Sequence, residues 1–270
     1  MLTIILGGGD LASGVALRLY RAGLHVVITE LAQPLAVRRS VSFAEAVYTG
    51  EVTVEGVTAR RINVPTDKLG ILMTISKGAI PVLVDPDAVS IDALHPTVVI
   101  DARMRKATAV LLGKPGMLIV GLGPGFEAGV NCSAVIETQR GPTLGRVYWQ
   151  GKPNPDSGLP DTVGPYQSER VLRAPADGTL DAYAQIGDVL SAGQPVASVD
   201  GEVVPAPFDG LLRGLLYPGL QVTAGLKIGD LDPRCDPALV QFVSDKALAV
   251  GGAVLEAILS RPNLRPLLWK

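Results

Sequence analysis

The sequence predicts an α/β protein in which a domain with a mainly parallel sheet is followed by a small all-β module and a C-terminal helix. Apolar runs alternate with segments of helical period over the first half of the chain, which is typical of parallel β-α-β units. A pattern of glycines and short apolar runs is then used twice, and an apolar helical period follows it. We therefore expect domains at residues 1–165, 166–234 and 235–270.

A glycine-rich turn follows the first predicted strand, residues 3–6. Gly7, Gly9 and Ala12 have the G-x-G-x-x-G/A spacing of a dinucleotide-binding turn, as in a Rossmann-like fold. There the first glycine permits a tight turn, the second lets the backbone approach a phosphate, and the small third residue lets the helix lie close to the sheet. The phosphate-binding segment that we expect consists of Gly7, Gly8, Gly9, Asp10, Leu11, Ala12 and Gly14.

The second predicted strand, residues 24–30, ends in a carboxylate. Glu30 follows Gly9 by about 20 residues, where dinucleotide-binding folds place the acidic residue that binds the ribose. This context favours a nucleotide site over the alternative, a glycine turn that serves packing alone. Arg38 and Arg39 come next, and two interpretations stay open for them: they reach a phosphate, or they form an ordinary solvated helix end.

Three more apolar runs, at residues 81–85, 97–101 and 117–126, read as buried strands. The first two end in aspartates and the third ends in a second glycine-rich loop. Ligands of open parallel sheets bind beyond the carboxyl ends of the strands, so these ends can line one crevice with the first glycine turn. For any single aspartate the alternative is an ordinary loop cap.

Three cations follow Asp101 in the run Asp-Ala-Arg-Met-Arg-Lys at residues 101–106. One interpretation is a clamp for a phosphate or a carboxylate, and the other is a set of loop cations held in water. The adjacent predicted crevice favours the clamp. In this part of the chain the candidate ligand-binding residues are Asp101, Lys106, Gly123 and Gly125.

Composition excludes several classes of protein. The 270 residues are 47% hydrophobic and 19% charged, which suits a soluble globular chain with a sizeable core. A net charge of −2 argues against a nucleic-acid partner, because such proteins carry clustered basic surface. No apolar run is long enough to span a bilayer, and the start lacks the basic region of a secretory signal. We expect a cytoplasmic protein without a membrane anchor.

Metal and catalytic motifs are missing from the sequence. The two cysteines, Cys132 and Cys235, are far apart and form no C-x-x-C pair, so a zinc site or disulfide framework is not indicated. The two histidines read as structural residues, and we expect no metal centre. The sequence has no G-x-S-x-G elbow, P-loop or H-E-x-x-H motif, so no catalytic residue is assigned.

Residues 151–169 are dense in proline and glycine and mark a boundary. After it, Ala-Pro-Ala-Asp-Gly-Thr-Leu at 174–180 recurs 32 residues later as Ala-Pro-Phe-Asp-Gly-Leu-Leu at 206–212. This doubled pattern resembles the biotinyl/lipoyl-type barrel-sandwich hybrid, whose two quasi-symmetric halves clasp each other. The turn between the halves, residues 198–204, contains no lysine to carry biotin or lipoate, so we interpret the module as structural or as a docking surface.

The last segment opens with Asp236-Pro237, an N-cap followed by a proline at the first helical position. An apolar helical period runs from there through residues 239–258. Gly251 and Gly252 lie inside it and cost about 1 kcal/mol each relative to alanine unless they allow close backbone packing. We expect this helix to dock back on the first domain.

Several motifs taken together carry a family resemblance. They are the glycine turn 7–14, Glu30 with Pro34 and Arg38-Arg39, the run 101–106, Gly-Pro-Gly-Phe-Glu-Ala-Gly at 123–129 and Val-Ile-Glu-Thr-Gln-Arg-Gly at 135–141. With them the chain resembles, over nearly its whole length, the YqeB-type family of accessory proteins of the selenium-dependent molybdenum hydroxylase system. The resemblance implies a bacterial, cytoplasmic protein that helps to mature or insert the molybdenum cofactor of a hydroxylase.

The resemblance supplies a context and no reaction. It implies as partners a molybdenum hydroxylase or its maturation proteins, and a small nucleotide ligand: NAD(P), another nucleotide or a molybdopterin nucleotide. A homo-oligomer stays open. The alternative is an NAD(P)-dependent oxidoreductase of unknown substrate, which is disfavoured because the sequence has no Tyr-x-x-x-Lys pair and no histidine in the crevice segments. A third hypothesis is a structural scaffold that binds no nucleotide.

Overall fold

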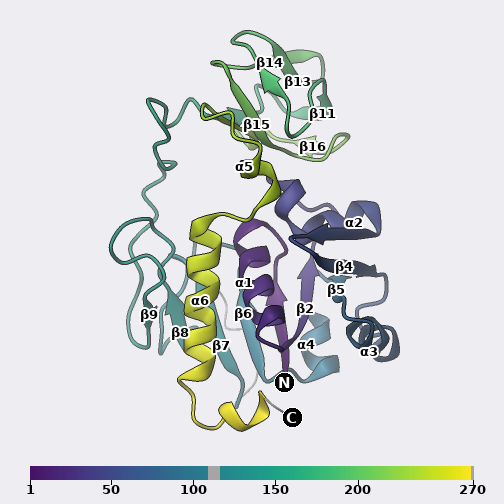
Figure 1. Cartoon of the computed structure of the whole chain (residues 1–270), viewed down its shortest axis with the longest axis vertical. Coiled ribbons are helices and arrows are strands. Elements are labelled where there is room, and N and C mark those ends of the chain that lie inside the picture. The colour runs from purple at the N-terminus through teal and green to yellow at the C-terminus, as the bar shows by residue number, and fades with distance from the viewer. Residues whose placement is uncertain (109–115, 269–270) are drawn as a thin grey trace. The chain divides into compact units, whose positions relative to one another are not determined.

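The computed structural model describes residues 1–108 and 116–268 of the chain (Figure 1). The chain divides into two compact units, neither of which is one continuous segment. The first unit comprises Met1–Pro34, Phe43–Ser157 and Val243–Lys270, and the second comprises Leu35–Ser42 and Gly158–Phe242. The boundary expected after residue 165 therefore lies at 157, and a short early segment belongs to the second unit.

One large sheet forms the centre of the first unit. Its strands are β1 (Leu2–Leu6), β2 (His25–Glu30), β3 (Glu51–Val54), β4 (Val57–Ile62), β5 (Ile80–Val84), β6 (Val98–Asp101), β7 (Leu118–Leu122), β8 (Ala134–Ile136) and β9 (Val147–Tyr148). Among the described residues they follow the order β3-β4-β5-β2-β1-β6-β7-β8-β9. Neighbours from β4 to β8 run parallel, whereas β3 and β9 pair antiparallel at the two edges. The predicted α/β class with a mostly parallel sheet is confirmed.

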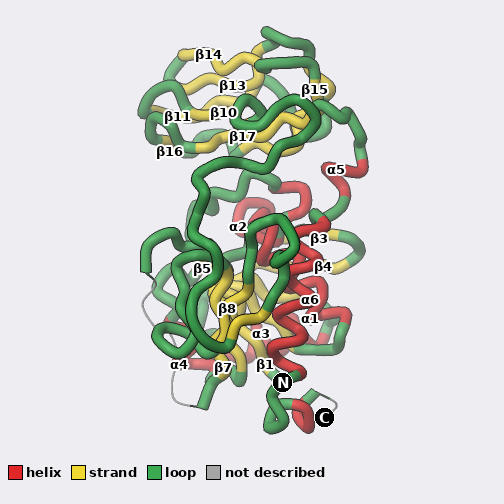
Figure 2. Tube along the Cα trace, turned by 90° about the vertical axis from the view of Figure 1, so that its left-hand side faces the viewer, coloured by secondary structure: helices red, strands yellow, loops and turns green. Residues whose placement is uncertain are grey.

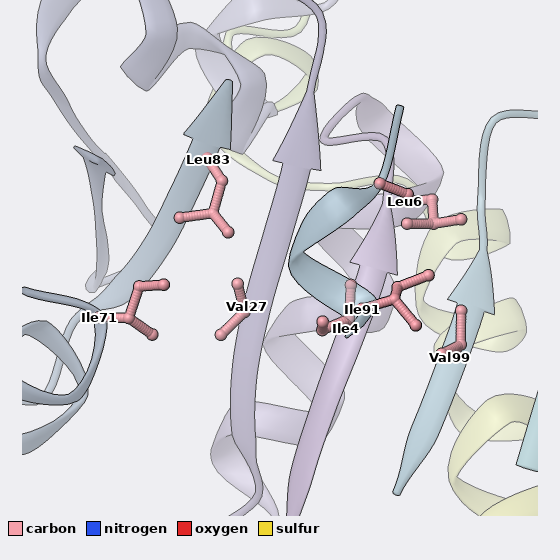
Figure 3. Packing of buried hydrophobic residues seen from close by; sticks show 8 residues of the cluster. Ile4, Leu6, Val27, Ile71, Leu83, Ile91 and Val99 are labelled. Atoms are coloured by element: carbon pink, nitrogen blue, oxygen red, sulfur yellow. The ribbon is translucent and has the colours of Figure 1, made fainter. Parts of the chain in front are cut away.

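Helices cover this sheet. They are α1 (Asp10–Arg21), α2 (Ala46–Thr49), α3 (Lys68–Ser76), α4 (Val89–Leu94) and α6 (Asp245–Leu259), with 3-10 turns η2 (Phe43–Glu45) and η3 (Arg265–Leu267). Figure 3 shows Ile4 and Val27 of neighbouring strands in one buried cluster with Ile71 of α3 and Ile91 of α4. Apolar residues alternate along each strand, so that one face of the sheet packs against α3 and α4.

Helices α1 and α6 lie side by side, although they come from opposite ends of the described chain (Figure 1). A Cβ placed on Gly14 would lie 2.6 Å from the Cβ of Ala247, and one on Gly251 would lie 2.7 Å from the carbonyl oxygen of Gly14. Nothing lies within 4 Å of the corresponding position on Gly252. Gly14 and Gly251 therefore permit close backbone contact between the two helices.

The expectation of one continuous closing helix is wrong. Helix α5 (Ala238–Gln241) belongs to the second unit and stops at Phe242, whose backbone is extended. The hydroxyl of Ser244 then accepts the backbone N–H of Ala247 at 3.1 Å and caps the start of α6. A new N-cap in the middle of the apolar period divides the segment into two helices.

The second unit contains two four-stranded antiparallel sheets among its described residues (Figure 2). Its elements are η1 (Arg39–Val41), β10 (Val171–Arg173), β11 (Gly178–Ala182), β12 (Val189–Leu190), β13 (Pro195–Val199), β14 (Glu202–Pro205), β15 (Gly210–Leu215), β16 (Gln221–Val222), β17 (Lys227–Asp232) and α5. The sheet orders are β10-β17-β15-β12 and β14-β13-β11-β16. Moving each strand by the 32-residue offset converts one order into the other, so the sequence repeat is a structural repeat.

The aspartates of the repeated Asp-Gly motif join the two halves. Asp177 accepts the backbone N–H of Ala224 at 2.7 Å, and Asp209 accepts that of Ala192 at the same distance. Each aspartate therefore holds a turn in the opposite half. Between β13 and β14 lies a tight turn in which Asp200 has a positive φ of 46°, and its carboxylate accepts the N–H of Thr179 at 2.8 Å.

Candidate functional site: a glycine turn at the reversal of strand order

The glycine turn lies at the carboxyl end of β1, where the strand order reverses. Strand β1 is flanked by β2 and β6, which the chain reaches in opposite directions across the sheet. In the pairing register Leu6 lies opposite Thr29 on one side and Asp101 on the other. The carboxyl ends of β1, β2 and β6 consequently meet beside residues 7–9, the position at which open parallel sheets bind ligands.

The three consecutive glycines have three different surroundings. Gly7 has a φ of +92°, a conformation that L side chains rarely adopt. Gly8 has an ordinary φ, but a Cβ on it would lie 2.9 Å from the backbone nitrogen of Ala44, which donates a hydrogen bond to the Gly8 carbonyl. Gly9, the N-cap of α1, has a φ of −70° and nothing within 4 Å of its Cβ position. Its own contacts thus give no steric reason for glycine at residue 9.

The N-cap of α1 is Gly9, whose Cβ position is open. The first N–H groups of a helix have no partner inside the helix and carry the positive end of its dipole. The side chain of Ser13 is fully buried here, where it donates to the Gly8 carbonyl and accepts the N–H of Phe43 at 2.9 Å. These two hydrogen bonds tie the backbone of the turn to the helix, and the free N–H groups of a helix start suit an anion.

Glu30 is tied to the turn by backbone hydrogen bonds. One carboxylate oxygen accepts the N–H of Gly8 at 2.7 Å and the other accepts the N–H of Leu31 at 2.8 Å. Burial raises the pKa of the Glu30 carboxyl, while the N–H groups of Leu31 and Gly8 oppose that increase. The carboxylate therefore lies beside Gly8 and is held there by two backbone N–H groups.

On the other side of the turn Asp101 holds an arginine. Arg103 binds the Asp101 carboxylate with Nε at 2.9 Å and Nη2 at 2.5 Å, and Asp101 is only 3% exposed. The Cγ of Arg103 lies 3.4 Å from the position that a Cβ on Gly7 would occupy. Arg105 approaches the same carboxylate, with its Nε at 4.0 Å. Cationic side chains thus border the turn opposite Glu30.

The other candidate ligand-binding residues of this region make contacts within the loops that follow the strands. Lys106 forms an ion pair with Asp156 at 2.7 Å, whereas Arg103 lies beside Gly7. Gly125 packs against backbone, since a Cβ on it would lie 2.5 Å from the carbonyl oxygen of Arg105. Gly123 has a φ of +85° and lies beside Met104 and Thr138, where it shapes a turn. Asp85 caps α4 with both carboxylate oxygens, which accept the N–H groups of Val89 and Ser90.

Arg38 and Arg39 belong to the second unit and bind protein groups there. Arg38 is 7% exposed and donates to the carbonyl oxygens of Leu239 and Phe242 at the end of α5. Arg39 donates to the carbonyl of Leu215 at 2.7 Å and lies over the ring of Tyr217. These contacts correspond to neither sequence interpretation, because the arginines hold α5 and β15 within their own unit.

The run at residues 101–106 could be identified from the sequence, but the position of Arg103 beside Gly7 could not. The signal available was its position two residues after a strand-end aspartate, which is a short and favourable reach for a bidentate pair. Ser13 was also missed, because a buried serine in an apolar helical period looks like ordinary packing. Of the predicted phosphate-binding segment, Gly7 to Ala12 line the turn and the helix start, while Gly14 faces α6.

Of the two cysteines, Cys132 is buried and Cys235 is exposed, and both are free thiols. Within residues 1–108 and 116–268 no group of three or more His, Cys, Asp or Glu side chains is arranged to hold a metal ion. Burial raises the pKa of the Cys132 thiol to about 11, so this cysteine is protonated at neutral pH. No helix in the described ranges has the length and apolar character needed to cross a membrane.

The fold and the site together define an α/β protein with a glycine-rich strand-to-helix turn, an acidic residue on one side and a guanidinium on the other. The chain is 44% identical to the uncharacterized protein YqeB of Escherichia coli strain K12 over 258 residues, or 96% of its length. This similarity supports the resemblance to the YqeB-type family that the sequence motifs indicate. The chain spans 47% of the length of that relative. No family model matches the chain.

Similarities to solved structures are remote. An aspartoacylase family protein from Mesorhizobium loti aligns with a TM-score of 0.26 and 15% identity, over 85% of this chain and 84% of that one. The ectoine utilization protein EutE from Ruegeria pomeroyi aligns with a TM-score of 0.25 and 11% identity over 85% and 84% of the two chains. Scores this low carry no argument about fold or function.

Proposed function

We propose that this chain is an accessory protein for the maturation or insertion of the molybdenum cofactor of molybdenum hydroxylases, including selenium-dependent ones, and that it binds a nucleotide or pterin nucleotide at the glycine turn. The observation that carries the binding proposal is Gly9. It has a relaxed backbone and open space at its Cβ position, so a bare backbone there suits a ligand that comes close. Gly7 and Gly8, by contrast, have structural reasons to be glycine.

The architecture supports a Rossmann-like interpretation of the first unit. The parallel strands β5-β2-β1-β6-β7-β8 have the order 3-2-1-4-5-6 when they are numbered along the chain without the β3–β4 hairpin. That is the order of the dinucleotide-binding fold, with its ligand at the reversal point. For the second unit we propose a barrel-sandwich hybrid without carrier function, because Asp200 and Gly201 form the turn where a carrier lysine would stand.

The accessory role is favoured over catalysis by the composition of the site. Of the side chains that border the turn, the Glu30 carboxylate is occupied by two backbone N–H groups, the Asp101 carboxylate is paired with Arg103, and the guanidinium groups stay protonated near neutral pH. The resemblance to the YqeB-type family supports the link to molybdenum hydroxylases and to their maturation proteins as partners. The alternative, an NAD(P)-dependent oxidoreductase, requires a group that can donate or accept a proton beside the nicotinamide.

Mass spectrometry of small molecules released from native protein tests the proposal. The expected result is a nucleotide or pterin nucleotide, supported by a thermal-shift panel of NAD, NADP, mononucleotides and molybdopterin nucleotide. Turnover of NAD(P)H with a substrate would favour the oxidoreductase. If no nucleotide is released and none raises the melting temperature, the binding proposal is wrong and a structural scaffold is the better description.

A further inference from the structure

We propose that helix α3 is the contact surface of a homodimer, in which two copies of the chain pair through a stripe of exposed apolar side chains on this helix. The α3 stripe consists of Leu69, Leu72 and Met73, which are 69%, 61% and 49% exposed. They are three and four residues apart along α3, so they share one side of the helix. The dimer is independent of the proposed nucleotide site, to which α3 contributes no residue.

The opposite side of α3 already packs this helix on its own sheet. Ile71 is fully buried in the cluster that includes side chains of β1 and β2, and Ile75 packs against the same cluster. The helix contacts β4, β5 and β2, and Figure 1 shows it at the margin of the first unit. A surface helix normally carries polar residues on its outer side, so a second apolar side indicates a partner outside the chain.

Lysines border the α3 stripe on both sides. Lys68 and Lys77 are exposed and lie nine positions apart (77 − 68), which is two and a half turns at about 3.6 residues per turn. The two lysines are therefore on opposite sides of the helix axis, one on each flank of the stripe. An apolar centre with a polar rim is the usual anatomy of a protein–protein interface.

The exposed area suits a second copy of the chain. Together with Val64, which is 56% exposed in the turn before α3, the stripe exposes on the order of 400 Å² of apolar surface. That is about half of the roughly 800 Å² that each partner buries in an interface of standard size, and the polar rim supplies the rest. Homodimer interfaces are the more apolar class, and a stripe that meets its own copy is covered by an equally apolar surface.

An antiparallel pairing of the two helices about a twofold axis fits the charges of α3. It places the start of each helix beside the end of the other, so that the helix dipoles attract. It also keeps the lysines apart, because Lys68 and Lys77 lie at opposite ends and on opposite flanks of the stripe. Leu72 is the middle residue of α3 (Lys68–Ser76), so it lies nearest to the axis and meets its own copy.

Analytical ultracentrifugation of the whole chain tests the proposal at protein concentrations from about 1 to 100 μM, which cover the dissociation constants of weak dimers. We expect a dimer at the upper end of this range. Leu72→Glu brings two carboxylates together at the axis and should raise the dissociation constant at least about thirtyfold. Val130→Glu, at a valine that is 66% exposed between β7 and β8, is the matched control and should leave the dissociation constant unchanged.

Cross-linking gives a second measurement. Leu72→Cys in a Cys235→Ser background should form a disulfide between two copies under mild oxidation, because residue 72 meets its own copy at the axis. Val130→Cys in the same background should not. The other native cysteine, Cys132, is buried and does not compete.

Two results would overturn the homodimer. One is a wild-type chain that stays monomeric up to about 100 μM, which would leave the α3 stripe to a different protein. The other is a dimer that Leu72→Glu and Val130→Glu affect alike, since the copies would then pair through another surface. Melting temperatures show whether Leu72→Glu is folded. If it is not, Leu69→Glu, at the most exposed residue of the stripe, and the cross-linking at residue 72 decide.

Discussion

Gly14 of α1 and Ala247 of α6 lie in direct backbone contact. A Cβ on Gly14 would come within 2.7 Å of the Ala247 carbonyl oxygen, so the two helices approach as closely as glycine allows. The contact is made twice, because Gly251, one helical turn after Ala247, meets the Gly14 carbonyl. The glycine at position 14, which the sequence assigns to the phosphate-binding segment, is therefore required for helix packing.

Helix packing predicts opposite effects for two adjacent glycines of α6. Gly251→Ala should lower the free energy of unfolding by about 1 to 3 kcal/mol, because the added methyl group overlaps the Gly14 carbonyl. Gly252→Ala has open space and should raise it by about 0.5 to 1 kcal/mol. Urea denaturation of both variants measures the difference. Equal effects of the two exchanges would show that α1 and α6 are not in close contact.

The glycine turn predicts a separation of binding from stability. Gly9→Val should abolish the ligand-induced rise in melting temperature, since its side chain occupies the space left for the ligand, and should change the ligand-free melting temperature little. Gly8→Ala is the contrasting variant and should destabilise the free protein, because its Cβ meets the Ala44 nitrogen. Retention of the full ligand shift by Gly9→Val would mean that the open space serves no ligand.

Acid should weaken the second unit through Asp232. This fully buried aspartate binds Arg234 at 2.7 Å and Arg213 at 3.3 Å. Burial alone would raise the pKa of Asp232, but the hydrogen bonds of Arg234 and the charges of Arg234 and Arg213 lower it to about 2, below its usual 3.8. Because the pKa is lowered, the ion pairs of Asp232 stabilise the folded state above pH 4, and this stabilisation is lost as the pH falls towards 2.

Asp232→Asn should therefore lower the melting temperature at pH 7, and the gap in melting temperature to wild-type protein should narrow as the pH is lowered from about 4 towards 2. Thermal melts across this range check the prediction. Asp181→Asn, an exposed position on β11, is the control and should give a small gap that does not change with pH. A constant gap for Asp232→Asn would argue against the ion pairs with Arg213 and Arg234.

The structural repeat predicts matched effects for its two aspartates. Asp177→Ala and Asp209→Ala each remove the acceptor for a turn N–H in the opposite half, at 2.7 Å in both cases. Each exchange should cost about 0.5 to 2 kcal/mol of stability. Chemical denaturation compares the two variants. A large effect of one and none of the other would show that the halves are not equivalent.

Sequence patterns identified the features that depend on neighbouring residues. The parallel strands, the tight turn at Gly7 and the 32-residue repeat follow from apolar period and turn glycines, which act locally. The carboxylate of Glu30 was also placed correctly at the end of β2 and reaches the turn. Its contact could be expected because parallel strands β1 and β2 end at the same edge of the sheet.

Features that depend on distant contacts were not predictable. The run from Asp236 to Ile258 looks like one helix, and its division at Ser244 goes with the passage of the chain from one unit to the other. Likewise, nothing local shows that Arg38 holds carbonyls some two hundred residues later in the chain. Among the cations after Asp101, only their three-dimensional neighbours separate Arg103, beside the turn, from Lys106, paired with Asp156.

The pairing of α1 with α6 also sets the timing of folding during synthesis on the ribosome. Helix α1 leaves the ribosome among the earliest segments, but the helix that covers its Gly14 face is translated only after the whole second unit. Until then the nascent first unit has an uncovered apolar helix next to its glycine turn. We expect α1 to reach its final packing only when α6 has been translated and has left the ribosome.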